Sequence, residues 1–118
     1  MAKFEYIEWL LVWLLETKTF RFEWDAGNST KNVLKHGVLQ NEVEEVFKLG
    51  SALPIGIQVR PVIPEERLAI VGPTFENRML IVVFTLRAGK IRPISVRPAH
   101  KKEKTQYEAI LRKIAERI

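Results

Sequence analysis

The feature that most restricts the fold is the apolar run from Met79 to Leu86, which is rich in β-branched residues. Such a run is shorter than most helices and is typical of a strand that is buried on both faces. Strand-like segments at residues 57–59, 68–71 and 91–97 accompany it, and Ala88-Gly89 provides a turn into the last of them. Short connections make neighbouring strands antiparallel. We therefore expect a mostly antiparallel sheet with residues 79–86 as its central strand.

Proline residues limit where two of these strands can lie. Pro61 and Pro64 end the segment 57–59 early or confine it to an edge, because proline cannot donate a ladder hydrogen bond. Pro93 lies inside the last strand and implies an edge position or a bulge there. With such a break, alternation alone does not predict whether Arg92 and Arg97 share a face of the sheet.

Helix signals lie on both sides of the strand-rich region. Near the C-terminus an apolar stripe has the spacing of an amphipathic helix and consists of Tyr107, Ile110, Leu111, Ile114 and Ile118. In the N-terminal half we expect a short helix that is capped by Asp25 or Asn28 and runs through Leu34, with Gly37 as the left-handed residue that ends it. A second short helix is expected to begin at Asn41, where Glu44 would complete a capping box.

The first 18 residues form an unusual segment in which the apolar run from Trp9 to Leu15 is flanked by glutamates. The run is too short and too acidic at its flanks for a transmembrane span or a signal peptide, so we expect a short helix. This helix can pack on the domain's own core, dock to a second subunit or partner, or lie on a membrane, which its lack of basic residues disfavours. The alternation of Phe20, Phe22 and Trp24 then predicts a half-buried strand.

These elements fit one domain. The chain has 118 residues, which is long enough to bury a core without disulfides, and it contains no low-complexity linker or internal repeat. We expect an α+β fold with a mostly antiparallel sheet, two short helices in the N-terminal half, a C-terminal helix and an extra N-terminal helix. Residues 1–18 are predicted to be the apolar helical extension, and residues 19–118 a single domain.

Basic residues are concentrated in the second part of the chain. Residues 51–118 carry 13 basic and 6 acidic side chains, whereas residues 1–50 carry 6 basic and 8 acidic ones. The stretch from Arg87 to Lys104 holds seven basic residues against Glu103 alone. Such a stretch favours a polyanionic partner, of which nucleic acid is the commonest in the cytosol, although a basic face also serves solubility.

The residue types present restrict the chemistry. The chain has no cysteine, which excludes disulfides, thiolate zinc sites and a cysteine nucleophile. Its two histidines, His36 and His100, lie far apart without a spaced carboxylate motif, so we expect no metal centre and no cofactor. Catalysis would therefore have to use arginine, lysine, histidine, glutamate or tyrosine side chains.

Two stretches of the chain carry a family pattern. The first contains Phe22-Glu23-Trp24-Asp25, Asn32, Lys35-His36-Gly37-Val38, Glu42 and Val46-Phe47. The second contains Glu66, Arg67, Leu80 to Thr85, Arg87, Ile91-Arg92, Ile94-Ser95, Arg97, Ala99, Glu103 and Tyr107. In order and spacing they resemble the BrnT family of toxins, whose fold belongs to the RelE-like group, over residues 20–108. The chain departs from the family pattern at Asn28, where members often carry lysine, at Pro93, and in having no aspartate after Val46-Phe47.

The resemblance implies a cytoplasmic, metal-independent ribonuclease that belongs to a type II toxin–antitoxin pair. The implied partners are an RNA substrate and a BrnA-like antitoxin that neutralises the toxin by direct binding, with operator DNA contacted only through the antitoxin. A homodimer through the N-terminal helix is also considered, and no membrane partner is expected.

RNA can be cleaved without a metal because it carries its own nucleophile, the 2′-hydroxyl. The enzyme must remove the proton of this group and neutralise charge on the phosphate, and a planar guanidinium can hold two phosphate oxygens. The candidate phosphate contacts are Arg67, Arg87 and Arg97. His36 is the candidate for proton transfer, because an unperturbed imidazole titrates near neutrality. The candidate RNA-binding residues are Lys35, Lys90, Arg92 and Lys101.

Each candidate also has a structural interpretation. The arginines can be charges at strand ends, and His36 can interact with the last carbonyl groups of a helix. Glu42 is another candidate base that can instead complement a helix dipole, and Tyr107 fits core packing better than chemistry. The catalytic hypothesis requires His36 and the three arginines to converge over one concave surface of the sheet. Its alternatives are a non-enzymatic basic module that binds nucleic acid and a pure interaction domain, such as a decayed toxin.

Overall fold

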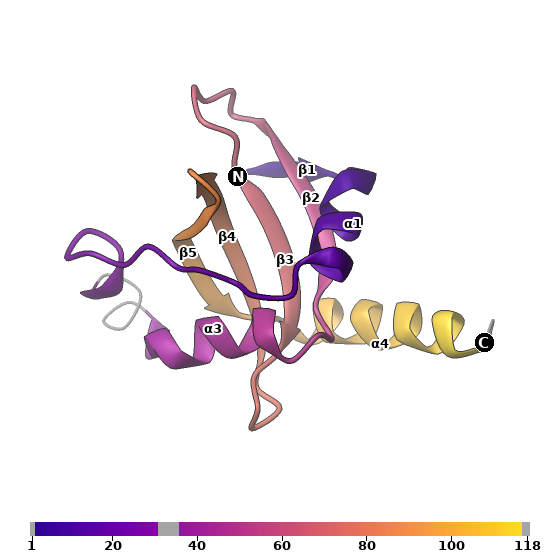
Figure 1. Cartoon of the computed structure of the whole chain (residues 1–118). Helices are drawn as coiled ribbons and strands as arrows, with labels where there is room; N and C mark the ends of the chain where they lie inside the picture. Colours follow the sequence, from indigo (N-terminus) through magenta and orange to yellow (C-terminus); the bar gives the residue numbers. More distant parts are fainter. Residues whose placement is uncertain (1, 31–35, 117–118) are drawn as a thin grey trace.

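The computed structural model describes residues 2–30 and 36–116. Within these residues the sheet contains five antiparallel strands in the order β1-β2-β3-β4-β5. They are β1 (Lys3–Glu5), β2 (Leu53–Arg60), β3 (Leu68–Pro73), β4 (Met79–Arg87) and β5 (Lys90–Pro98). The labelled helices in Figure 1 are α1 (Glu8–Glu16), α3 (Gln40–Lys48) and α4 (Lys101–Glu116). The predicted α+β class and antiparallel sheet are confirmed.

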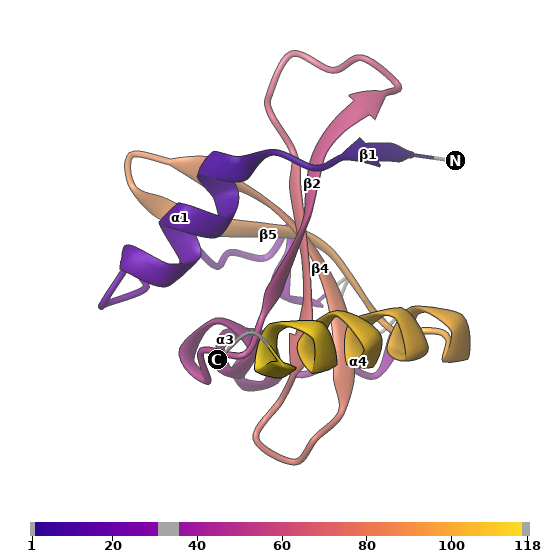
Figure 2. The same cartoon turned by 90° about the vertical axis from the view of Figure 1, so that its right-hand side faces the viewer.

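The two faces of the sheet have different environments. Helices α1 and α3 lie on one side of it, which we call the core face, whereas α4 crosses its lower end (Figure 2). Leu80, Val82 and Phe84 of β4 alternate onto the core face and are fully buried with Phe47 of α3. The residues between them, such as Ile81, point to the opposite side, which we call the open face.

The strand at the centre of the sheet is β3. All six of its residues are buried, as a strand with neighbours on both sides requires. The prediction that residues 79–86 form the central strand is therefore wrong. The physical reason is that β1 and β2 add two strands beyond β3, and β1 comes from a segment in which the sequence predicts a helix.

The edge position predicted from Pro93 is confirmed. Strand β5 is the last strand of the sheet, and its register against β4 shifts between Val83 and Phe84, next to the proline. With this shift, Arg92 lies opposite Thr85 and Arg97 lies opposite Ile81. Because Thr85 and Ile81 alternate onto the same side of β4, both arginines belong to the open face.

The N-terminal segment packs on the domain's own core. Leu10 is fully buried, and the ring of Trp13 stacks on that of Phe84 with the centroids 5.8 Å apart. Before the helix, residues 3–5 form β1 and pair with β2, so this part of the segment is a strand and not a helix. After it, residues 20–24 run extended beside β5 but form only an isolated bridge, between Phe22 and Ile91.

The helix ends differ in part from the predictions. Helix α3 begins at Gln40, and the side chain of Glu42 accepts a hydrogen bond from the Leu39 N–H at 3.0 Å, so the capping box predicted from Asn41 and Glu44 is wrong. Gly37 has the left-handed φ of 63° that was expected, while most of the helix predicted before it lies outside the described residues. No helix in the described ranges is both long and apolar enough to cross a membrane.

Helix α4 has the predicted position but is only lightly packed. Tyr107 is its one buried residue, and the Tyr107 hydroxyl donates a hydrogen bond to the carbonyl oxygen of Ser51. Desolvation accordingly raises the Tyr107 pKa. Further residues of the predicted stripe are exposed, namely Ile110 (48%), Leu111 (37%) and Ile114 (45%). Ile118 lies outside the described residues.

Candidate functional site

Three arginines gather at the end of the sheet where β4 turns into β5, and we call Arg67, Arg87 and Arg92 the three-arginine cluster. Arg87 ends β4, and Arg92 lies in β5 opposite Thr85. Arg67 directly precedes Leu68, which faces the core, so alternation directs Arg67 to the open face. The positive charges of all three act on the carboxylate of Glu65.

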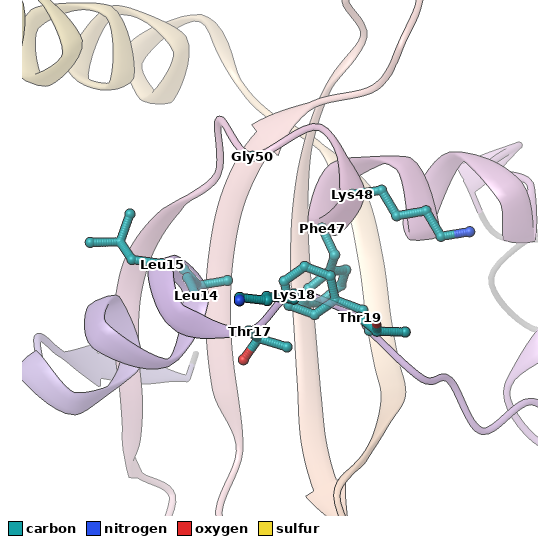
Figure 3. Close-up of a pocket in the computed structure, with 9 residues that line it drawn as sticks. Leu14, Leu15, Thr17, Lys18, Thr19, Phe47, Lys48 and Gly50 are labelled. Carbon is teal, nitrogen blue, oxygen red and sulfur yellow. The ribbon is translucent and has the colours of Figure 1, made fainter.

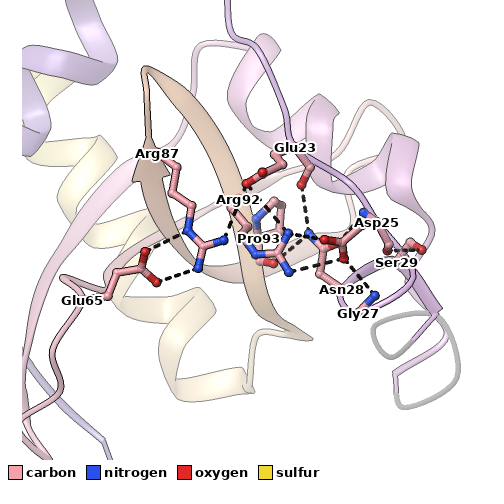
Figure 4. Close-up of polar contacts among 9 residues, drawn as sticks. All are labelled: Glu23, Asp25, Gly27, Asn28, Ser29, Glu65, Arg87, Arg92 and Pro93. Atoms are coloured by element: carbon pink, nitrogen blue, oxygen red, sulfur yellow. Dashed lines mark hydrogen bonds and ion pairs between the residues drawn. The ribbon is translucent and has the colours of Figure 1, made fainter.

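Two of these guanidinium groups are hydrogen-bonded to carboxylates (Figure 4). Arg87 donates hydrogen bonds to both oxygens of Glu65, at 2.8 and 3.2 Å. Arg92 donates to both oxygens of Asp25, at 2.8 and 3.3 Å. These bonds stabilise the charged carboxylates, and each is the main reason why the pKa of Glu65 and that of Asp25 are lowered. The guanidinium groups of Arg87 and Arg92 therefore already present paired N–H donors to an anion with two oxygens.

Asn28 holds the acidic segment beside β5. Its buried side-chain amide donates hydrogen bonds to the carbonyl oxygens of Glu23, at 3.0 Å, and Pro93, at 3.1 Å. Its side-chain oxygen accepts the N–H of Asp25 at 2.7 Å. Asn28 and Pro93 are two of the positions where the chain departs from the family pattern, and they contact each other (Figure 4). The contact fixes Glu23 and Asp25 next to the three-arginine cluster.

Arg97 belongs to a separate ion pair at the start of α4. It donates to both oxygens of Glu103, at 2.8 and 2.7 Å, and Glu103 also accepts the backbone N–H of His100. Chiefly the hydrogen bond from Arg97 lowers the Glu103 pKa from 4.5 to about 2. Arg97 lies opposite Ile81, six residues along β4 from Arg87, which corresponds to about 20 Å. The pair anchors α4 to the sheet.

His36 lies at the other end of the sheet. Its carbonyl oxygen accepts a hydrogen bond from Arg78 at 3.2 Å, and Arg78 also pairs with Glu42 at 3.1 Å. Arg78 directly precedes β4 and Arg87 ends it, so the two positions are about 30 Å apart along the strand. The expected convergence of His36 with Arg67, Arg87 and Arg97 is therefore not observed, because α3 and the turn before β4 hold His36 at the far end.

The remaining sequence candidates are dispersed. Lys90 lies opposite Arg87 and is exposed beside the three-arginine cluster. Lys101 is exposed at the first turn of α4, and Lys35 lies outside the described residues. Sequence reasoning missed Glu65, which follows the prolines of the β2–β3 connection and carries no local signal of its pairing with Arg87.

Two surface hollows differ in the chemistry of the residues that line them. The one in Figure 3 has a volume of about 450 Å³ and lies between the ends of α1 and α3. Its lining includes Phe20, Phe47, Lys18 and Lys48. None of the described residues that line it carries a carboxylate or an imidazole. A second hollow, of about 350 Å³, lies on the open face and includes Arg97 in its lining. Of these two hollows, the one on the open face therefore combines an arginine with a carboxylate, Arg97 with Glu103.

Comparison with known proteins bears on this face. A family model described as "Ribonuclease toxin, BrnT, of type II toxin-antitoxin system" matches residues 24–103. The chain belongs to the BrnT family. The matched range contains the three-arginine cluster, Asp25 and Glu65, whereas β1, α1 and most of α4 lie outside it. BrnT proteins are ribonuclease toxins of type II toxin–antitoxin systems, so membership implies an RNA substrate and an antitoxin partner.

A solved structure supports the fold. The crystal structure of the ribonuclease toxin BrnT from Brucella abortus, at 23% sequence identity, superposes with a TM-score of 0.51. The match covers 70% of this chain and 100% of the Brucella chain. No curated protein matches the sequence. The two proteins share the BrnT fold, and this chain carries additional segments beyond it.

Proposed function

We propose that this chain is a metal-independent endoribonuclease toxin that cleaves RNA by attack of a 2′-hydroxyl on the adjacent phosphodiester. The observation that carries the proposal is the three-arginine cluster within the region that matches the BrnT family. A phosphodiester presents two anionic oxygens, and a guanidinium group can bind both. In the transition state the same groups would neutralise the charge that develops on phosphorus-bound oxygens.

RNA has to displace a carboxylate to reach Arg87. The side chains of Arg87 and Glu65 are 48% and 42% exposed. Ion pairs this open to solvent contribute little to stability, so a phosphodiester can replace Glu65 at small cost. We therefore propose Arg67, Arg87 and Arg92 as the ligands of the scissile phosphate.

The other basic residues are proposed as contacts to more distant phosphates. Lys90 lies next to the cluster, and Arg97 lies further down the open face, with Lys101 beyond it on α4. Lys35 is kept as a proposed RNA contact from its sequence position alone. Phosphate contacts of this kind supply affinity without sequence preference and weaken as the salt concentration rises.

The test is RNA cleavage by the purified protein in the presence of EDTA. We expect products with 2′,3′-cyclic phosphate and 5′-hydroxyl ends, and no cleavage where the attacking 2′-hydroxyl is replaced by hydrogen. Arg87→Ala should reduce the rate by about 100-fold or more, as loss of one transition-state donor does. Arg112→Ala, the same change at an exposed site on α4, is the matched control.

Each outcome of these assays supports or refutes one part of the proposal. Folded wild-type protein that leaves RNA intact would refute the enzyme, and binding without cleavage would favour a non-enzymatic nucleic-acid-binding module. Cleavage only with a divalent metal would refute metal independence. His36→Gln should leave most of the activity, and its complete loss would move the scissile phosphate to the start of β4.

We propose a BrnA-like antitoxin as the partner, which neutralises the toxin by direct binding in the cytoplasm and supplies any contacts to operator DNA. Co-expression with a small protein encoded beside this chain should restore growth that the chain alone arrests. The RelE-like group is the proposed wider fold relationship. Growth arrest that persists when the two proteins form a stable complex would refute this mode of neutralisation.

A homodimer through α1 is a separate proposal. The helix uses Leu10 and Trp13 in the core and leaves Trp9 (40%), Val12 (42%) and Leu15 (74%) exposed. If the chain dimerises there, Trp9→Ser with Leu15→Ser should convert it to a monomer in light scattering. A wild-type monomer, or a dimer unaffected by both changes, would exclude this interface.

A further inference from the structure

The carboxylate of Glu23 lies between two arginines of the cluster. The Glu23 N–H donates to the carbonyl oxygen of Ile91 at 2.8 Å, which holds the residue against β5. Its Oε2 atom lies 3.9 Å from Nη1 of Arg87 and 3.8 Å from Nη1 of Arg92. Figure 4 shows this carboxylate between the two guanidinium groups, with Glu65 beside Arg87 and Asp25 beside Arg92. Glu23 therefore lies next to both guanidinium groups, and its Oε2 atom accepts no hydrogen bond from either of them.

The Glu23 carboxylate also differs from its neighbours in its hydrogen bonding. Oε2 is buried and accepts no hydrogen bond from any residue that the structure describes, although the side chain as a whole is 38% exposed. Asp25 and Glu65 instead accept two hydrogen bonds each from an arginine. A buried oxygen without a donor costs free energy, and such atoms call for an explanation such as a catalytic role.

We propose that Glu23 is the general base that activates the 2′-hydroxyl of RNA, an inference that rests on the proposed ribonuclease function. A general base needs a lone pair that no donor holds, next to the group that binds the reacting phosphate. Glu23 meets both conditions. A phosphodiester held by Arg87 and Arg92 lies within reach of the carboxylate that both guanidinium groups already face.

The proposed reaction needs no molecule other than RNA and water. The Glu23 carboxylate takes the proton from the 2′-hydroxyl, and the 2′-oxygen forms a bond to phosphorus. The bond from phosphorus to the 5′-oxygen breaks, and this oxygen takes a proton from water. The hydroxide that remains removes the proton from Glu23 and regenerates the carboxylate. The products are a 2′,3′-cyclic phosphate and a 5′-hydroxyl.

The other candidate proton acceptors either accept hydrogen bonds from the arginines of the cluster or lie far from it. Asp25 and Glu65 are engaged by Arg92 and Arg87. Glu42 accepts hydrogen bonds from the Leu39 N–H and from Arg78, and it lies with His36 at the opposite end of β4. Of the three described carboxylates that contact the guanidinium groups of Arg87 and Arg92, Glu23 is the one with a buried oxygen that accepts no hydrogen bond.

The experiment compares Glu23→Gln, which keeps the shape of the side chain, with Glu76→Gln, the same change at an exposed turn away from the cluster. We expect Glu23→Gln to lower kcat by about 100- to 10,000-fold, the usual contribution of a general base, with KM within about threefold of the wild-type value. Glu76→Gln should leave both constants unchanged. Thermal unfolding confirms that each variant is folded.

Chemical rescue separates proton transfer from a structural role. Glu23→Ala leaves room for a small carboxylate, so added formate should restore part of the lost rate, whereas chloride at the same concentration should not. Glu23→Asp should retain more activity than Glu23→Gln, because it keeps the carboxylate. If Glu23→Gln does not fold, Glu23→Ala with formate decides the question.

These experiments distinguish a wrong general base from a wrong function. If Arg87→Ala abolishes cleavage while folded Glu23→Gln keeps kcat within threefold of wild type, Glu23 is not the base but the ribonuclease proposal stands. Absence of rescue by formate, with activity also lost in Glu23→Asp, would likewise overturn the inference. If the wild-type protein does not cleave RNA, the proposed function itself is wrong.

Discussion

The substitution Leu10→Ala tests whether the N-terminal segment is part of the cooperative core. Leu10 is fully buried, and its helix also contributes Trp13, whose ring contacts those of Phe20, Phe47 and Phe84. Residues 1–23 lie outside the region that matches the BrnT family. The packing nevertheless makes α1 a component of the core and not an appended arm.

The expected loss of stability follows from the burial of Leu10. Removing a fully buried leucine side chain costs the lost transfer free energy plus the cost of the cavity, typically 2–5 kcal/mol, and we expect about 3 kcal/mol here. For a domain of this size that loss lowers the melting temperature by roughly 12 °C. Leu39→Ala is the matched control, because it makes the same change outside α1 at a residue that is 51% exposed. We expect it to change stability by no more than about 0.5 kcal/mol.

The assay is urea denaturation of both variants and the wild type, followed by circular dichroism and by tryptophan fluorescence. The two signals should give one transition, with the midpoint of Leu10→Ala clearly lower and the slope unchanged. Equal effects of the two substitutions would refute the reasoning. A separate early transition seen only by fluorescence would show that α1 unfolds independently of the sheet.

Further changes test other contacts. Glu103→Gln should lower the free energy of unfolding by about 1–2 kcal/mol at pH 7, after allowance for solvent screening. Because Arg97 depresses the Glu103 pKa from 4.5 to about 2, this contribution is present above pH 4.5 and is lost as the pH falls towards 2, where stability curves of variant and wild type should meet. Gly56→Ala should displace β1, since Gly56 has φ 147° and a Cβ atom there would overlap the Glu5 backbone; unchanged hydrogen exchange in β1 would contradict this. Arg78→Ala should cost about 1–3 kcal/mol through the acceptors it leaves unpaired, and an unaltered melting temperature would show that these bonds are not needed.

Local patterns in the sequence predicted much of the fold. The apolar run at residues 79–86, the turn at Ala88-Gly89 and the amphipathic C-terminal helix all lie where periodicity and turn chemistry place them. Pro93 correctly indicated an edge strand with a shifted register. These features depend on neighbours within a few residues, and the BrnT pattern likewise consists of residue types at short, fixed spacings.

Strand order and the assembly of the site were decided by the tertiary structure. Nothing local in residues 3–5 indicates that they pair with β2, and this pairing makes β3 the central strand. The sequence identified Arg67 and Arg87 as candidates but did not place Glu65 or Glu23 beside them, nor separate His36 from them by the length of β4. Hydrogen bonds and ion pairs between segments depend on how the chain closes over long distances, whereas periodicity records only which side of each segment is buried.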